Sequence, residues 1–195
     1  KTFVQGLNSS QNLALNKVLS AQSMAVIHGP PGTGKTTTLI ESISETLKVE
    51  NQVLVCAPSN NAVDLLIEKL SERDISVLRI GHPARVTEEM LGLTLDARVA
   101  NHKDFKDMKS MRKKAEEYFA LAKKYKRSFG YAEREQRKLL YEEAHQYKDS
   151  ADQLSFYITN DIISKAQVIA GTLESGNNHA IRNIKYSTVI IVEAA

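Results

Sequence analysis

The chain has 195 residues, of which 42% are hydrophobic and 25% charged, with a formal net charge of +3. This length suffices for a buried core in one domain, or in one domain that carries an insertion. The single cysteine, Cys56, excludes an internal disulfide and a multi-cysteine metal site. No apolar run approaches the ~18 residues that span a bilayer, and the N-terminus lacks a signal-peptide core, so we expect a cytoplasmic protein with no membrane partner.

Short apolar runs rich in valine and isoleucine predict the strands of a parallel sheet. They show little polar alternation, which is typical of strands buried on both faces. Helical patterns over Thr37–Val49 and Asn61–Glu72 alternate with the first three runs, which predicts an α/β fold. The predicted strands are Met24–His28, Val53–Ala57, Val77–Ile80, Gln167–Ala170 and Thr188–Val192.

From about Pro83 to Lys165 the apolar spacing becomes helical. A heptad-like seam with steps of four and three covers Leu140, Ala144, Tyr147, Ala151, Leu154 and Ile158. A rougher stripe runs from Phe105 to Tyr125 or Lys126, and Ser128-Phe-Gly130 separates the two because glycine commonly ends helices. We expect an antiparallel helical hairpin over residues 83–165, inserted into a sheet domain formed by residues 1–82 and 166–195.

The predicted hairpin is also the basic part of the chain. Between Lys103 and Asp149 there are 14 Lys/Arg and 9 Asp/Glu, a local net charge of +5. These charged faces are interpreted either as plain solvated surface or as a help in holding a nucleic-acid backbone. The apolar positions are interpreted as the seam between the helices.

Residues Gly29-Pro-Pro-Gly-Thr-Gly-Lys-Thr36 match the phosphate-loop pattern G-x-x-x-x-G-K-[ST] in full. Glycines let the backbone N–H groups turn inward around phosphate oxygens, Lys35 adds a point charge, and the following helix adds its positive N-terminal end. The pattern therefore predicts a nucleoside triphosphate site. The candidate binding residues are Gly29, Pro30, Pro31, Gly32, Thr33, Gly34, Lys35, Thr36 and Thr37.

Three other segments carry polar groups that are candidates for ligand binding. Gln11 begins a predicted helix, and its amide can both donate to and accept from an adenine edge, or it is a surface helix residue. The loop that follows the second strand places Ser59, Asn60 and Asn61 where they could contact phosphate or sugar, or cap the next helix. The last strand ends at Glu193, as in folds that present a carboxylate to metal and attacking water.

In this order the segments resemble the motifs of superfamily 1 helicases, in the group that contains the nonsense-mediated-decay helicase, senataxin and the immunoglobulin-mu-binding helicase. The inserted hairpin sits where these helicases carry a helical subdomain. The matching segments are Leu7-Asn-Ser-Ser-Gln11 with the Q motif, Gly29–Thr36 with motif I, Ala57-Pro-Ser-Asn60 and Ala62-Val-Asp64 with motif Ia, Val77-Leu-Arg-Ile-Gly81 with the next strand, Gly171-Thr-Leu-Glu-Ser with the Thr-Leu segment, and Val189–Ala195 with motif II.

This resemblance implies a RecA-like first motor domain that uses ATP and Mg²⁺, works as a monomer, and couples hydrolysis to movement along single-stranded DNA or RNA. It assigns Gln11 to adenine, Lys35 to the β- and γ-phosphates, and Thr36 to Mg²⁺. Glu193 would orient or deprotonate the attacking water. The implied contacts to the nucleic acid are Pro58, Ser59, Asn60, Asn61 and Thr172.

Two departures from the family pattern change this expectation. Val192 stands where the family has the aspartate of motif II, so we expect nucleotide binding with impaired hydrolysis. The chain also stops at Ala195, before the second motor domain, so we expect a fragment that does not unwind a duplex alone. Two alternatives stay open: an AAA+ ATPase, which shares the phosphate loop, and a nucleotide-gated scaffold that does not hydrolyse ATP.

Overall fold

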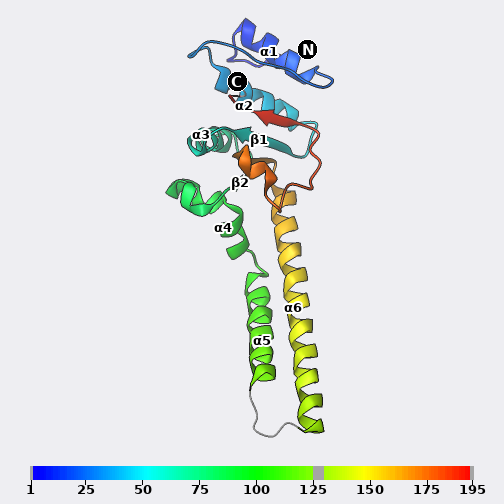
Figure 1. Cartoon of the computed structure of the whole chain (residues 1–195). Helices are drawn as coiled ribbons and strands as arrows, with labels where there is room; N and C mark the ends of the chain where they lie inside the picture. The colour runs from blue at the N-terminus through cyan, green and yellow to red at the C-terminus, as the bar shows by residue number, and fades with distance from the viewer. Residues whose placement is uncertain (1, 125–129, 194–195) are drawn as a thin grey trace. The chain divides into compact units, whose positions relative to one another are not determined.

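A computed structural model describes residues 2–124 and 130–193, which form two compact units (Figure 1). Unit 1 comprises Lys1–Leu95 and Ser164–Ala195 and contains the sheet, whereas unit 2 comprises Asp96–Ile163 and is helical. Among the described residues, no helix has the length and apolar character needed to cross a membrane.

The sheet of unit 1 has four parallel strands in the order β2-β3-β1-β4. Val168 lies opposite both Val53 and Val77, so β3 is central although it comes third in the chain. This arrangement confirms the predicted parallel α/β fold. The strands are β1 (Val53–Ala57), β2 (Val77–Ile80), β3 (Val168–Thr172) and β4 (Val189–Ile191).

Helices α2 (Lys35–Thr46) and α3 (Asn60–Ser71) bury their apolar faces with the sheet. An ion pair between Glu41 of α2 and Arg73, just after α3, links the two helices and raises the pKa of the Arg73 guanidinium. The buried core comprises Ile40, Ile43, Val53, Val55, Ala57, Val63, Leu66, Ile67, Leu70, Val77, Val168 and Ala170. Five of the predicted strands and helices therefore contribute residues to one core.

Helix α1 (Ser9–Leu19) is held to the N-terminal segment by a buried asparagine. The Asn12 side chain accepts from the Val4 N–H at 2.9 Å and donates to the Leu7 carbonyl at 2.9 Å. At its N-terminus, Asn8 and Gln11 form a reciprocal capping box. This box fixes where the helix begins.

The prediction of a strand at Met24–His28 is wrong in this structure. The segment joins no strand ladder among the described residues, and the side chains of Met24 and Val26 are 80% and 78% exposed. An apolar run becomes a strand only where a neighbouring strand can pair its backbone N–H and C=O groups. The phosphate loop therefore follows an extended segment that lies outside the sheet.

Unit 2 is an antiparallel pair of helices, α5 (Phe105–Lys123) and α6 (Tyr131–Lys165, whose last residues belong to unit 1). Arg112 contacts Ser155, Tyr118 stacks on Tyr147 with ring centroids 5.6 Å apart, and Arg137 donates to the Ala122 carbonyl. The contacts pair the start of one helix with the end of the other, so the two helices are antiparallel. An antiparallel helix pair is present as predicted, with the seam residues Met108, Ala115, Ala122, Ala144, Ala151 and Ile158 buried, but the helical unit spans Asp96–Ile163 and not the predicted 83–165. Ser128 and Phe129 of the predicted break, like Tyr125 and Lys126, lie outside the described residues.

Short elements complete the chain. Short 3₁₀ segments follow β2 and β3, and one short α-helix leads into unit 2. These elements are η1 (Pro83–Arg85), η2 (Glu88–Leu93), α4 (Leu95–Ala100) and η3 (Glu174–Asn177).

Candidate functional site: the phosphate loop and the carboxyl edge of the sheet

The phosphate loop closes on its own lysine. Lys35 Nζ donates to the carbonyl oxygens of Gly29 at 2.6 Å and Pro30 at 2.9 Å, and Thr33 Oγ1 donates to the Pro30 carbonyl at 2.8 Å. An ammonium group has three donors, so Lys35 keeps one for another acceptor. Its charge therefore lies over the loop in which a phosphate would sit.

The loop leads directly into helix α2. Gly34 takes the N-cap position with a left-handed φ of 78°, and no side chain of the described residues caps this helix. The first N–H groups of α2 thus lack an intrahelical partner, and the helix end carries partial positive charge. Thr36 and Thr37 lie exposed in this first turn. The arrangement is suited to an anionic ligand.

Gln11 contacts the phosphate loop from helix α1. Its Nε2 donates to the Thr33 carbonyl at 3.1 Å, while its Oε1 accepts from the Asn8 N–H at 2.9 Å. A Cβ at Gly34 would overlap Gln11 Nε2, so the loop needs glycine here for space as well as for conformation. The structure brings the predicted adenine-binding residue against the loop, with its amide engaged by protein groups.

At the end of β1, a polar turn begins helix α3. Ser59 is the N-cap, and its Oγ accepts from the Ala62 N–H at 3.2 Å, as the capping interpretation predicted. Pro58 and Asn61 are exposed and Asn60 is partly buried. The cap occupies one lone pair of the Ser59 oxygen, and its O–H stays available as a donor.

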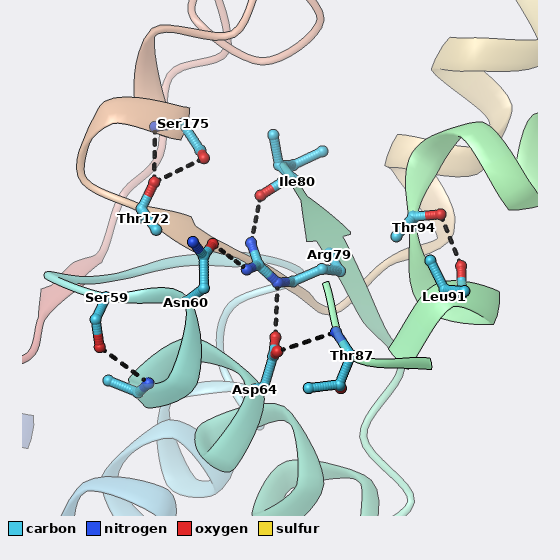
Figure 2. A network of polar contacts seen from close by, with 11 residues as sticks. Ser59, Asn60, Asp64, Arg79, Ile80, Thr87, Leu91, Thr94, Thr172 and Ser175 are labelled. Atoms are coloured by element: carbon cyan, nitrogen blue, oxygen red, sulfur yellow. Dashed lines mark hydrogen bonds and ion pairs between the residues drawn. The ribbon is translucent and has the colours of Figure 1, made fainter. Parts of the chain in front are cut away.

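Asn60 belongs to a buried polar network centred on Arg79 of β2 (Figure 2). Arg79 donates through Nη2 to Asn60 Oδ1 at 2.8 Å, through Nε to Asp64 Oδ1 at 3.0 Å and through Nη1 to the Ile80 carbonyl at 2.6 Å. Its side chain has no solvent exposure, and that of Asp64 is 9% exposed. A Cβ on Gly81 would lie 2.9 Å from Nη1, so glycine leaves room for the guanidinium.

The end of β3 carries a second hydroxyl-rich turn. Thr172 Oγ1 lies 2.9 Å from Ser175 Oγ and accepts from the Ser175 N–H at 3.3 Å. Gly171 permits a close approach of this turn to β2, because a Cβ there would lie 3.0 Å from the Ile80 carbonyl oxygen. Thr172 thus shares the carboxyl edge of the sheet with the Asn60 turn (Figure 2).

The chain leaves β4 at Val192 and Glu193. The Val192 N–H donates to the Cys56 carbonyl at 2.8 Å, and its side chain packs partly buried against the core. Glu193 is exposed and has a left-handed φ of 51°, a conformation that costs a non-glycine residue about 1–2 kcal/mol. Ala194 and Ala195, the end of the predicted motif II, lie outside the described residues.

Two further groups, Cys56 of β1 and Tyr186 before β4, have altered acidity. Burial raises the pKa of the Cys56 thiol, which keeps it protonated and unreactive. Burial, with a smaller contribution from Cys56, raises the pKa of Tyr186 to about 12. The Tyr186 hydroxyl is buried and has no hydrogen-bond partner among the described residues.

The parallel sheet gathers the candidate residues only in part. The ends of β1, β3 and β4 bring Asn60, Thr172 and Glu193 to one edge, and Gln11 reaches the phosphate loop. Among the described residues, no group of three or more His, Cys, Asp or Glu is placed to hold a metal ion. Sequence reasoning missed the Arg79 network, although an arginine within the apolar run Val77–Ile80 was a signal that a buried partner was needed.

Comparisons with known proteins agree with this architecture. A family model described as an AAA domain matches residues 6–195. Over 113 residues the chain is 42% identical to the DNA-binding protein SMUBP-2 of Rattus norvegicus, covering 58% of this chain and 11% of that protein. It is 36% identical over 118 residues to an uncharacterized ATP-dependent helicase of Methanocaldococcus jannaschii, covering 59% of this chain and 18% of that protein.

A third relative matches almost the whole chain. It is a regulator of nonsense transcripts 1 homolog from Neurospora crassa, 30% identical over 191 residues, which cover 96% of this chain and 15% of that protein. The chain spans between about a tenth and a fifth of the length of these relatives. The chain therefore belongs to the AAA domain family matched over residues 6–195, in the superfamily 1 helicase group that includes the regulator of nonsense transcripts 1 homolog, and it corresponds to the first domain of those helicases.

Proposed function

We propose that the intact protein moves along single-stranded nucleic acid and that this domain supplies its ATP site and part of its strand-binding surface. The observation that carries the proposal is the shared edge of the parallel sheet. The Asn60 turn, the Thr172 turn and Glu193 all follow carboxyl ends of strands there. Ligands of open α/β sheets bind at this edge.

For ATP, the phosphate loop and α2 would bind the triphosphate. The single donor left on Lys35 would meet a β- or γ-phosphate oxygen, and the N–H groups at the start of α2 would meet the others. Gln11 would exchange its hydrogen bond to the Thr33 carbonyl for the adenine edge. Glu193, exposed at the end of β4, would orient the attacking water.

The residues present fit Mg²⁺ only in part. Thr36 offers one hydroxyl oxygen in the exposed first turn of α2, but the valine side chain at 192 has no oxygen to accept a hydrogen bond from metal-bound water. Mg²⁺ would therefore be held mainly by the nucleotide phosphates. This favours nucleotide binding over hydrolysis in the chain as it stands, which also supports the alternative of a nucleotide-gated scaffold.

Single-stranded DNA or RNA would lie over the turns that follow β1 and β3. Hydroxyl and amide donors of Ser59, Asn60, Asn61 and Thr172 suit phosphate and sugar oxygens, and Pro58 offers an apolar contact. Phosphate and sugar are common to every nucleotide, so these contacts would bind the backbone without base specificity. A second RecA-like domain would complete the motor, and unit 2 would act as an inserted subdomain in a monomeric protein.

Two binding measurements test the proposal. Lys35→Ala should weaken binding of a fluorescent ATP analogue at least tenfold, because the loop loses its only charged side chain, whereas the exposed control Lys69→Ala should change it less than twofold. Labelled 20-nucleotide oligo(dT) and oligo(U) should bind with an affinity that falls as salt rises, and more tightly than a duplex of equal length. Absence of nucleotide binding, or of any preference for single strands, would contradict the proposal.

A further inference from the structure

Core packing alone does not require an arginine at position 79. The neighbours of Arg79 in β2 are Val77, Leu78 and Ile80, and all four residues are buried. An apolar side chain of similar volume stabilises such a position at least as well as a buried ion pair does. The guanidinium also lies beside the N-terminus of α3, where a positive charge is unfavourable and Asp64 must balance it.

What the guanidinium does determine is the orientation of the Asn60 amide. Arginine has donors only, so the group that faces Nη2 at 2.8 Å must be the Asn60 oxygen. The Nδ2 donors then point away from Arg79, as Figure 2 shows. Among the described residues, no hydrogen bond is formed by Asn60 Nδ2. The amide therefore presents two free donors at the carboxyl edge of the sheet.

We infer that Arg79 is a positioning residue for nucleic-acid binding, which fixes Asn60 with its Nδ2 donors toward a phosphate oxygen of the bound strand. This inference rests on the proposed function. Asp64 Oδ1 accepts from the guanidinium, and Asp64 Oδ2 lies 3.5 Å from the Thr87 backbone nitrogen, so the same network reaches the segment after β2. Gly81 leaves the space that the guanidinium occupies. Arg79 itself is fully buried and does not touch the strand.

A double-mutant cycle on oligonucleotide affinity tests the inference. Asn60→Ala should weaken oligo(dT) or oligo(U) binding roughly tenfold, the loss expected for one hydrogen bond to a charged group. Arg79→Lys keeps the charge near Asp64 but cannot hold three acceptors with a planar fork, so it should weaken binding to a similar degree. If Arg79 acts through Asn60, the double variant should bind no more weakly than Asn60→Ala alone.

Two controls separate this role from general damage. Arg73→Lys changes another arginine that pairs with a buried carboxylate, at the far end of α3, and should leave oligonucleotide affinity within twofold. The affinity of Arg79→Lys for the ATP analogue should also stay within twofold of the original chain. Additive losses in the double variant, or an equal loss of nucleotide affinity, would overturn the inference.

A measurement on the unchanged chain covers the case in which Arg79→Lys does not fold. The side-chain amide resonances of Asn60, assigned by their absence from Asn60→Ala, should shift when the oligonucleotide is added. Unshifted Asn60 resonances in a chain that binds the oligonucleotide would reject the inference and leave the proposed function standing. A chain that binds no oligonucleotide would reject both.

Discussion

Replacing Val192 by aspartate tests how far the side chain at this position limits metal binding. The Val192 backbone is fixed by its 2.8 Å hydrogen bond to Cys56, so a new carboxylate would take the place of the partly buried isopropyl group. Losing about half of a valine's burial costs about 1 kcal/mol, and partial burial of the new charge adds to this cost. Without metal, Val192→Asp should therefore lower the free energy of unfolding by about 1–2 kcal/mol.

With nucleotide and Mg²⁺ present, Val192→Asp should instead stabilise the folded, ligand-bound chain. A carboxylate that accepts hydrogen bonds from metal-bound water improves metal affinity roughly 10–100-fold, which corresponds to about 1.4–2.7 kcal/mol. The assay is binding of a fluorescent ATP analogue as a function of Mg²⁺ concentration, followed by steady-state ATP hydrolysis. The half-saturating Mg²⁺ concentration should fall 10–100-fold, and turnover should rise.

Val192→Asn is the matched control, because asparagine has the same shape without the charge. It should destabilise the metal-free chain to a similar degree but shift the Mg²⁺ dependence less than threefold. An unchanged Mg²⁺ dependence in Val192→Asp, together with unchanged turnover, would refute the reasoning that the missing carboxylate limits this site.

Three further predictions concern stability and the phosphate loop. Gly34→Ala should lower the free energy of unfolding by about 1 kcal/mol because of the left-handed φ at this position, and it should also displace Gln11. The melting temperature and the nucleotide affinity should therefore both decrease. The control Gly176→Ala, with open space around it, should change neither. Ala151→Leu should overpack the hairpin seam, where Ala151 has no exposure, and lower the urea unfolding free energy by about 1–3 kcal/mol. Because burial raises the Tyr186 pKa from 10 to about 12, the folded state keeps its proton longer than the unfolded state. The free energy of unfolding should thus be unaffected by this group below pH 10 and should fall as the pH rises toward 12. The difference in unfolding free energy between wild type and Tyr186→Phe should follow the same pH dependence, and a difference that does not change between pH 10 and 12 would contradict the assignment.

Periodicity predicted elements that bury an apolar face or stripe. The run Val53–Ala57 forms β1 at the predicted residues, and the seam through Ala144, Ala151 and Ile158 is the buried stripe of α6. Both patterns lie within the sequence of the element itself, because an element that packs on a core needs one apolar face whatever its partner is. The capping role of Ser59 was equally local and was also among the predicted alternatives.

Features that depend on a distant partner were not predictable in the same way. The run Met24–His28 has the composition of a strand but gains no ladder among the described residues. The hydrogen bonds from Arg79 to Asn60 and Asp64 join residues 19 and 15 positions apart, and no sequence period specifies them. The contact of Gln11 with Thr33 likewise depends on how α1 packs, because motif spacing fixes residue type and not geometry.

The position of β3 at the centre of the sheet has a consequence for folding. Pairing β2 with β3 closes a loop that includes all of unit 2, and the entropic cost of closure grows with loop length. His102 Nε2 lies 3.1 Å from Asp161 Oδ2, so unit 2 joins its own two ends across 59 positions. If the hairpin forms first, the open loop shortens from roughly 87 to roughly 30 residues, which lowers the closure cost by about 1 kcal/mol and speeds pairing about fivefold. Unit 2 thus favours rapid formation of a sheet to which it contributes no strand.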